Sequence, residues 1–209
     1  MQRQTNKMAP PVILFDYPFS PYAKKIRILF AAAGIPYKRC DVPMVLPRPT
    51  LLDLDITFRR IPVLAIGGDV YCDSALIIDI IQKHLGGLPT SSADHAYEFF
   101  GNHVFYQGLS CIPPSLFTED FIKDRAPIFP ILARKDFGTL GPSGKAEFKT
   151  HLEIIERDFL AKASPFINGS KPALADIHLI WVVSWMMSSL GLAEVPGCGK
   201  DKLPKIWKL

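Results

Sequence analysis

The chain has 209 residues, 48% of them apolar, and a net charge of +4 at pH 7 from 24 basic and 20 acidic side chains. A chain of this length and composition can bury a core in one large or two small globular domains. The charge excess is small and spread along the chain, so no nucleic-acid partner is expected, and the longest apolar stretch, around residues 177–187, is too short to span a membrane.

The cysteines form neither a C-x-x-C pair nor the spacing with histidines that is typical of zinc sites. No metal site is therefore expected. Scattered cysteines are common in proteins of reducing compartments, and the N-terminal sequence MQRQTNKMAPP has no apolar run typical of a secretory signal. We expect a cytoplasmic protein. The four cysteines are Cys40, Cys72, Cys111 and Cys198.

The first elements are predicted as a strand followed by a helix. Residues 1–10 are polar and are expected to form a loose tail, and residues 11–15, PVILF, predict a buried strand. Ser20 is a favourable N-cap, Pro21 suits the first helical position, and apolar residues then recur at helical spacing. Gly34 predicts the end of this helix.

A second strand is predicted over residues 35–42, followed by an irregular segment, residues 43–59, that contains three prolines. Residues 63–66, VLAI, then form a strand, and the turn Gly67-Gly68-Asp69 predicts a hairpin. A helix from about Ala75 should end at Gly86-Gly87. The order of these elements is β-α-β, loop, β-β-α.

Polar and proline residues around this hairpin indicate a binding site. Pro62 directly precedes the strand, where a residue without an N–H is tolerated, and the Ile61–Pro62 bond is expected to be cis. Asp73 and Ser74 stand where a helix N-terminus presents unpaired N–H groups to an anion.

The second half of the chain shows helical patterns and no convincing strands. Residues 88–92, LPTSS, predict a linker between domains. Residues 113–142 contain five prolines, so helices there must be short or broken. Residues 143–163 predict an amphipathic helix, and residues 173–190, apolar nearly all round, predict a buried central helix.

Three motifs, in this order, resemble those of cytosolic glutathione transferases. They are FSPYAKKIRILFAAAGIPY at residues 19–37, RIPVL with CDSALI at residues 60–64 and 72–77, and PFINGSKPALADIHL at residues 165–179. Each motif alone is weak evidence for the resemblance, but the three motifs in this order are strong evidence. The resemblance extends from Val12 to Leu209. The chain resembles most the broad group of these transferases that has a serine before a proline at the start of the first helix, a group that includes fungal members.

This resemblance implies an α/β thioredoxin-like domain over residues 11–88 and an all-α domain over residues 93–209. It implies glutathione as co-substrate, with its thiol ionised for attack on a small electrophilic molecule, and a homodimer. Ser20 matches the catalytic serine of the family, and the same serine can cap the helix. Tyr17 is an alternative thiol activator, whereas Tyr22 is expected to be a packing residue. No cysteine stands at position 20, which argues against thiol–disulfide exchange.

By the same resemblance, each part of glutathione has a partner. Ile61, beside Pro62, would offer its backbone to the cysteinyl part, and Asp73 and Ser74 would hold the γ-glutamyl carboxylate and amine. Arg60 would meet the glycyl carboxylate. The alternative for Asp73 and Ser74 is simple helix capping, and for Arg60 it is a solvated surface charge.

Residue 173 departs from the family pattern, because an alanine stands where a serine or threonine usually caps the helix. Asp176 is therefore expected to be the structural acceptor at this helix start. Two other functions stay open: a glutathione-transferase-like module that binds glutathione or a partner protein without turnover, and a glutathione-dependent isomerase. The sequence does not identify the electrophile.

Overall fold

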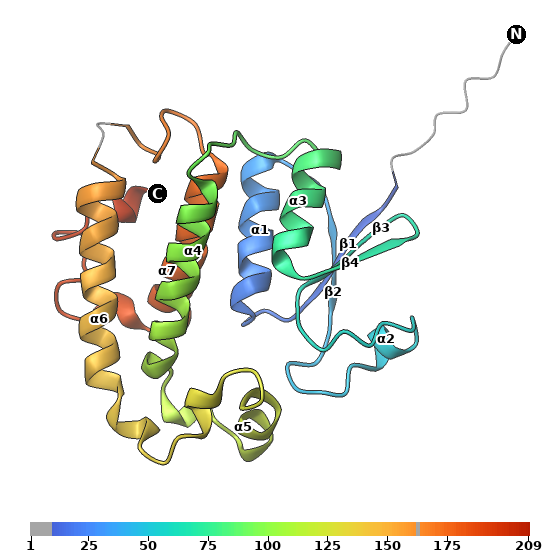
Figure 1. Ribbon diagram of the computed structural model, residues 1–209, viewed down its shortest axis with the longest axis horizontal. Helices are drawn as coiled ribbons and strands as arrows, with labels where there is room; N and C mark the ends of the chain where they lie inside the picture. Colours follow the sequence, from blue (N-terminus) through green and yellow to red (C-terminus); the bar gives the residue numbers. More distant parts are fainter. Residues whose placement is uncertain (1–9, 162–163) are drawn as a thin grey trace, which may run out of the picture.

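The computed structural model describes residues 10–161 and 164–209. The expected tail, residues 1–10, lies outside these ranges apart from Pro10. The first half of the described chain is a four-stranded sheet with helices on both faces (Figure 1). Its elements are β1 (Val12–Asp16), α1 (Pro21–Ala33), β2 (Lys38–Asp41), α2 (Pro49–Leu52), β3 (Val63–Ile66), β4 (Asp69–Cys72) and α3 (Ser74–His84).

The sheet has the order β2-β1-β3-β4, in which β1 is parallel to β2 and antiparallel to β3. Successive side chains of a strand point to opposite faces of the sheet. Leu14 and Leu64 accordingly join the core beneath α1 and α3, while Phe15 and Val63 join the smaller core on the face of α2. The predicted thioredoxin-like arrangement of the first domain is confirmed.

Helix α1 begins and ends where the sequence predicts. Ser20 is its N-cap, Pro21 its first residue, and Gly34 follows its end with a left-handed φ of 65°. The peptide bond between Ile61 and Pro62 is cis, as expected.

Two boundaries in the first domain differ from the prediction. The second strand covers only Lys38–Asp41, because Gly34 is left-handed and Pro36 has no N–H to donate to a neighbouring strand. The segment expected to be irregular contains the single helical turn α2, which starts at Pro49.

The second half is a helical domain made of α4 (Asp94–Gly108), α5 (Glu119–Arg125), α6 (Gly141–Ile154) and α7 (Leu174–Ser189). Helix α6 is shorter than predicted: it ends at Ile154 and continues as a π-helical turn to Phe159, and the last two residues of the predicted range lie outside the described part. The proline-rich segment forms 3-10 turns around α5, as expected. No helix in the described ranges combines the length and apolar composition that a membrane span requires.

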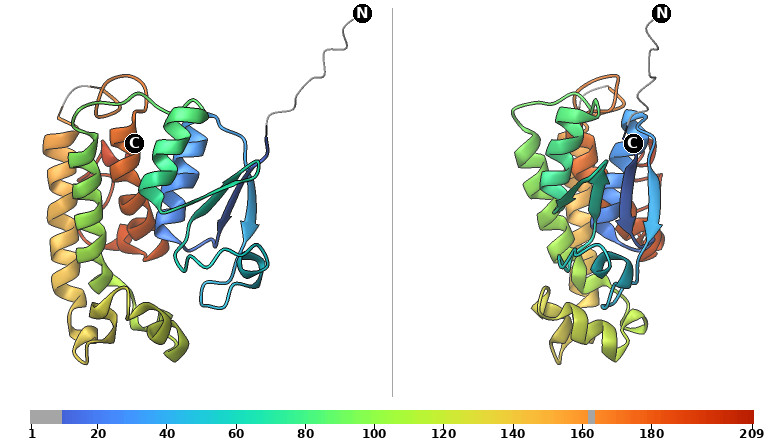
Figure 2. Two further views of the ribbon diagram at one scale, coloured as in Figure 1. Left: turned by 45° about the vertical axis from the view of Figure 1, so that its right-hand side comes forward. Right: turned by 90° about the vertical axis from the view of Figure 1, so that its right-hand side faces the viewer.

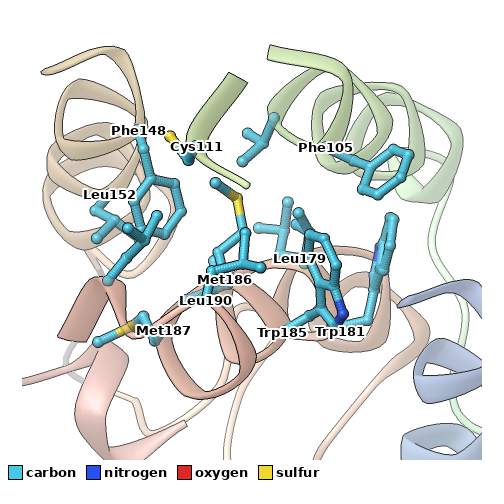
Figure 3. Close-up of a cluster of buried hydrophobic side chains, with 14 of the residues drawn as sticks. Phe105, Cys111, Phe148, Leu152, Leu179, Trp181, Trp185, Met186, Met187 and Leu190 are labelled. Carbon is cyan, nitrogen blue, oxygen red and sulfur yellow. The ribbon is translucent and has the colours of Figure 1, made fainter. Parts of the chain in front are cut away.

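Helix α7 is the centre of the helical domain. It lies between α1 of the first domain and the α4–α6 pair (Figures 1 and 2). Figure 3 shows Trp181 and Trp185 of α7 near Phe105 of α4, with Phe148 of α6 on the other side of the cluster. Twelve of the 16 residues of α7 are buried, on all sides of the helix, which explains why its sequence is apolar nearly all round.

The start of α7 is fixed by Asp176, which is 2% exposed. Its carboxylate accepts the N–H of Ala173 at 2.8 Å and the N–H of Ile167 at 2.9 Å. The Asp176 side chain thus caps the helix start at Ala173, whose own side chain has no acceptor, and it fixes the preceding loop to the helix through Ile167. Burial raises the pKa of Asp176, while these N–H bonds oppose the shift.

We expect Asp176→Ala to destabilise the protein by about 1–3 kcal/mol, because two buried N–H groups lose their acceptor. Thermal unfolding followed by circular dichroism measures the effect. Asp158→Ala is the matched control, since that carboxylate is exposed and pairs with the exposed Arg157, and its melting temperature should stay close to that of the wild type. Equal melting temperatures for both variants would contradict the structural role.

Candidate functional site

A cavity of about 270 Å³ lies between the two domains, and all six residues predicted for the site line it. The start of α1 and the start of α3 both open into this cavity. Unpaired N–H groups at two helix N-termini make it suitable for a ligand with negative charge. The six residues are Ser20, Arg60, Ile61, Pro62, Asp73 and Ser74.

Ser20 is held at the cavity wall by its own helix and by α7. Its Oγ accepts the N–H of Ala23 at 3.3 Å, and the preceding carbonyl, of Phe19, accepts the indole N–H of Trp185 at 2.9 Å. Ser20 is 2% exposed. A hydroxyl oxygen that accepts one bond can still donate its hydrogen to a ligand. Ser20 therefore caps the helix and has the geometry of a donor.

The two tyrosines near Ser20 have different surroundings. The hydroxyl of Tyr17 lines the cavity and accepts a hydrogen bond from Arg125 at 3.1 Å. Tyr22 packs against Phe105 and Trp181, and its hydroxyl donates to Asn102 at 3.2 Å. Burial strongly raises the pKa of Tyr22. Its phenol therefore stays neutral, as suits a packing residue.

The start of α3 places Asp73 and Ser74 side by side at the cavity. Asp73 has a φ of 76°, a conformation that is uncommon for residues other than glycine and that Asp and Asn tolerate best. Its carboxylate accepts the N–H of Ala75 at 2.9 Å and so caps the helix. The carboxylate is exposed, so its remaining lone pairs can meet a ligand.

Arg60 and Ile61 precede the hairpin on the same wall. Within the described ranges, the guanidinium of Arg60 has no ion-pair or hydrogen-bond partner, and the backbone N–H and C=O of Ile61 have none either. An unpaired cation and an unpaired peptide group are the donor and acceptor that a short peptide ligand requires.

The proline-rich segment forms the far wall of the cavity, and α5 carries an arginine that the sequence analysis did not identify. Arg125 donates to the carbonyl of Met44 and to Tyr17, and Arg59 donates to the backbone carbonyl of Asp124 at 2.6 Å. These contacts tie α5 to the first domain. No local pattern could have indicated them, since the residues that meet are 65 to 108 positions apart.

Aromatic and aliphatic side chains from α4 and the proline-rich segment line the rest of the cavity. This part can accept an apolar group beside the polar half that Ser20 and α3 provide. The residues are Phe105, Ile112, Phe121, Phe129 and Leu132.

A buried charge cluster lies where α1, α4 and α7 meet. The ammonium of Lys25 on α1 is 2.7 Å from the carboxylate of Glu98 on α4, and Nδ1 of His178 on α7 is 3.8 Å from the same carboxylate. Burial lowers the pKa of Lys25. Burial would raise the pKa of Glu98, but Lys25 together with the neighbouring His178 and His95 holds that pKa below its ordinary value. The pair joins the two domains beside the cavity.

Family models divide the chain much as the fold does. A model described as the N-terminal domain of glutathione S-transferases matches residues 14–88, and one described as a domain of unknown function matches residues 108–208.

Several curated relatives are plant proteins. Glutathione S-transferase U4 of Arabidopsis thaliana is 26% identical over 72 residues, which are 34% of this chain and 32% of that protein. The chain thus spans about a third of this relative's length. Glutathione S-transferase U22 of the same plant is 24% identical over 193 residues, which are 90% of this chain and 79% of that protein.

Solved structures share the whole fold. A Tau class glutathione S-transferase from mango, Mangifera indica, has a TM-score of 0.66 and 21% identity, covering 95% of this chain and 86% of that one. A rice glutathione S-transferase in complex with glutathione has the same TM-score and 16% identity, covering 95% and 84%. At these identities the likeness shows the two-domain fold.

Proposed function

We propose that this chain is a glutathione-dependent transferase, because residues 14–88 match the model described as the N-terminal domain of glutathione S-transferases. It binds glutathione in the interdomain cavity, ionises the thiol and directs the thiolate at a small electrophile. The observation that carries this function is the convergence of the α1 and α3 N-termini, with Ser20, Asp73 and Arg60, on one cavity.

The polar half of the cavity fits each part of the tripeptide. The γ-glutamyl carboxylate binds at Ser74 and the N–H groups that open α3, and its ammonium pairs with Asp73. The cysteinyl peptide group pairs with the free backbone of Ile61, next to Pro62. Arg60 binds the glycyl carboxylate.

The thiol then lies near Ser20, the proposed catalytic residue. A free thiol has a pKa of about 8.5 and is mostly protonated at pH 7. The Ser20 hydroxyl donates to the sulfur, and the positive end of α1 favours the negative charge there. The thiolate forms a bond to an electrophilic carbon, the leaving group departs with its electron pair, and the thiol proton goes to solvent. This serine-type assignment follows the resemblance to a group that includes fungal members, and Ser20 is preferred over Tyr17 because Ser20 caps α1, where the positive end of the helix favours a thiolate. Tyr17 accepts a hydrogen bond from Arg125 but can still donate its own hydrogen, so it stays the alternative thiol activator.

Two assays separate this function from the alternatives. Retention on glutathione-agarose tests binding, and conjugation of glutathione to a generic aryl halide tests turnover. The proposal predicts both. Retention without conjugation would favour a non-catalytic binding module, and consumption of an isomerisable substrate without loss of free glutathione would favour an isomerase.

Asp73→Asn should weaken glutathione binding by about 10- to 100-fold, because a charged hydrogen bond of about 1.5–3 kcal/mol is lost. Asparagine tolerates the positive φ and can still cap α3, so the fold is kept. Calorimetry with glutathione measures the dissociation constant. Asp69→Asn, at the exposed start of β4 and outside the cavity, is the control. An unchanged constant for Asp73→Asn would reduce this residue to a helix cap.

The assembly is proposed to be a homodimer in a cytoplasmic, reducing compartment. Large apolar side chains are exposed on α3 and α4, among them Leu76 at 47% and Phe99 at 75%, and a second copy would cover them. All four cysteines are free thiols, as expected under reducing conditions. A monomer mass by light scattering at every concentration would contradict the dimer.

A further inference from the structure

Three side chains with metal-binding atoms meet on the helical domain, away from the cavity. They are His103 on α4 and the pair Glu147 and His151 on α6, and one ligand atom from each lies within 4.8 Å of the others. Helices α4 and α6 run side by side (Figures 1 and 2). Glu147 and His151 are one helical turn apart, so both face the neighbouring helix.

The imidazole of His151 is buried without a hydrogen-bond partner for one of its nitrogens. His151 is 8% exposed, and its Nδ1 is fully enclosed and unpaired within the described ranges. The ring of Phe100 stands edge-on at 5.6 Å and the ring of His103 at 5.2 Å. A buried nitrogen without a partner costs free energy. A bound ion that accepts the lone pair of this nitrogen would remove that cost.

The cluster is open to solvent on one side. His103 is exposed and Glu147 half-buried, so an ion can enter from solvent.

We propose that His103, Glu147 and His151 bind a divalent transition-metal ion, with zinc the best fit, and that water completes the coordination. Two imidazoles and one carboxylate are a donor set that zinc uses with a fourth, open position. Bonds of about 2.0–2.2 Å place the ligand atoms roughly 3.5 Å apart, which rotation of the exposed His103 side chain can provide. The ion would join α4 to α6, and none of its ligands lines the glutathione cavity.

Calorimetric titration of the chelator-treated full chain with zinc chloride tests this site. We expect one saturable equivalent and a rise in melting temperature on addition of zinc. His103→Gln should weaken binding at least tenfold, and since that residue is exposed, the variant should fold. Glu147→Gln should do the same. His84→Gln, an exposed histidine on α3, is the matched control and should bind as the wild type does.

Cobalt(II) identifies the ligands independently, because its absorption spectrum distinguishes nitrogen and oxygen donors from the thiolates of the four cysteines. The site is supported if the wild type with cobalt gives an absorption spectrum without thiolate bands, and if His103→Gln does not give this spectrum. The proposal would be overturned if zinc does not bind saturably at micromolar concentrations. It would also be overturned if the double variant His103→Gln with Glu147→Gln binds zinc as tightly as the wild type does. Neither result depends on glutathione binding or turnover.

Discussion

Replacing Ser20 with alanine should slow conjugation about 10- to 100-fold, with little effect on glutathione affinity. The lost hydrogen bond is made to a charged sulfur and is worth about 1.5–3 kcal/mol, and each 1.4 kcal/mol changes a rate tenfold. In the proposed complex Asp73, Ser74 and Arg60 bind the rest of the tripeptide, and the variant leaves these residues in place. Initial rates with an aryl halide and calorimetry with glutathione measure the two effects.

Ser20 also caps α1, so Ser20→Ala should cost about 1 kcal/mol of stability. Rates must therefore be compared well below the melting temperature. Thr118→Ala removes a similar N-cap, at the start of α5, and serves as the control for the loss of a cap alone. If Ser20→Ala keeps full activity while Tyr17→Phe loses it, Tyr17 is the thiol activator.

The second large effect concerns the charge pair beside the cavity. Glu98→Ala should destabilise the protein by about 3 kcal/mol, because the ammonium of Lys25, which is 0% exposed, loses its partner. Chemical denaturation measures this free energy. Glu153→Ala removes the carboxylate of an exposed pair with Lys149 and should have little effect.

The double variant Lys25→Met with Glu98→Leu distinguishes the loss of a partner from the loss of packing. It removes both charges and keeps most of the volume, so it should recover most of the stability that Glu98→Ala loses. A double variant no more stable than Glu98→Ala would show that the charge of Lys25 is not the cause.

Local signals in the sequence were sufficient for most elements of the first domain, but not for the extent of β2 or for the turn α2. Ser20, Pro21 and Gly34 define α1 because a cap, a proline and a left-handed glycine act within a few residues of each other. The hairpin after Pro62 follows from the same kind of short-range signal. The second strand was predicted too long because the left-handed Gly34 and Pro36, which has no N–H, stop the pairing with β1 before Lys38.

The far wall of the cavity could not be predicted, because it depends on contacts between distant residues. Arg125 meets Tyr17 across 108 positions, and Lys25 meets Glu98 across 73. Neither pair leaves a periodic pattern. The histidine cluster is different: Glu147 and His151 are four residues apart on a predicted helix, and the expectation of no metal site overlooked this spacing.

The pKa of the glutathione thiol bound to this chain tests the central claim most directly. Ultraviolet absorption of the thiolate, followed while the pH of the complex is raised, gives that pKa. We predict a value at least about one unit below the 8.5 of a free thiol in the wild type, and a return toward 8.5 in Ser20→Ala. A wild-type complex that titrates like free glutathione would contradict the claim that this cavity activates the thiol.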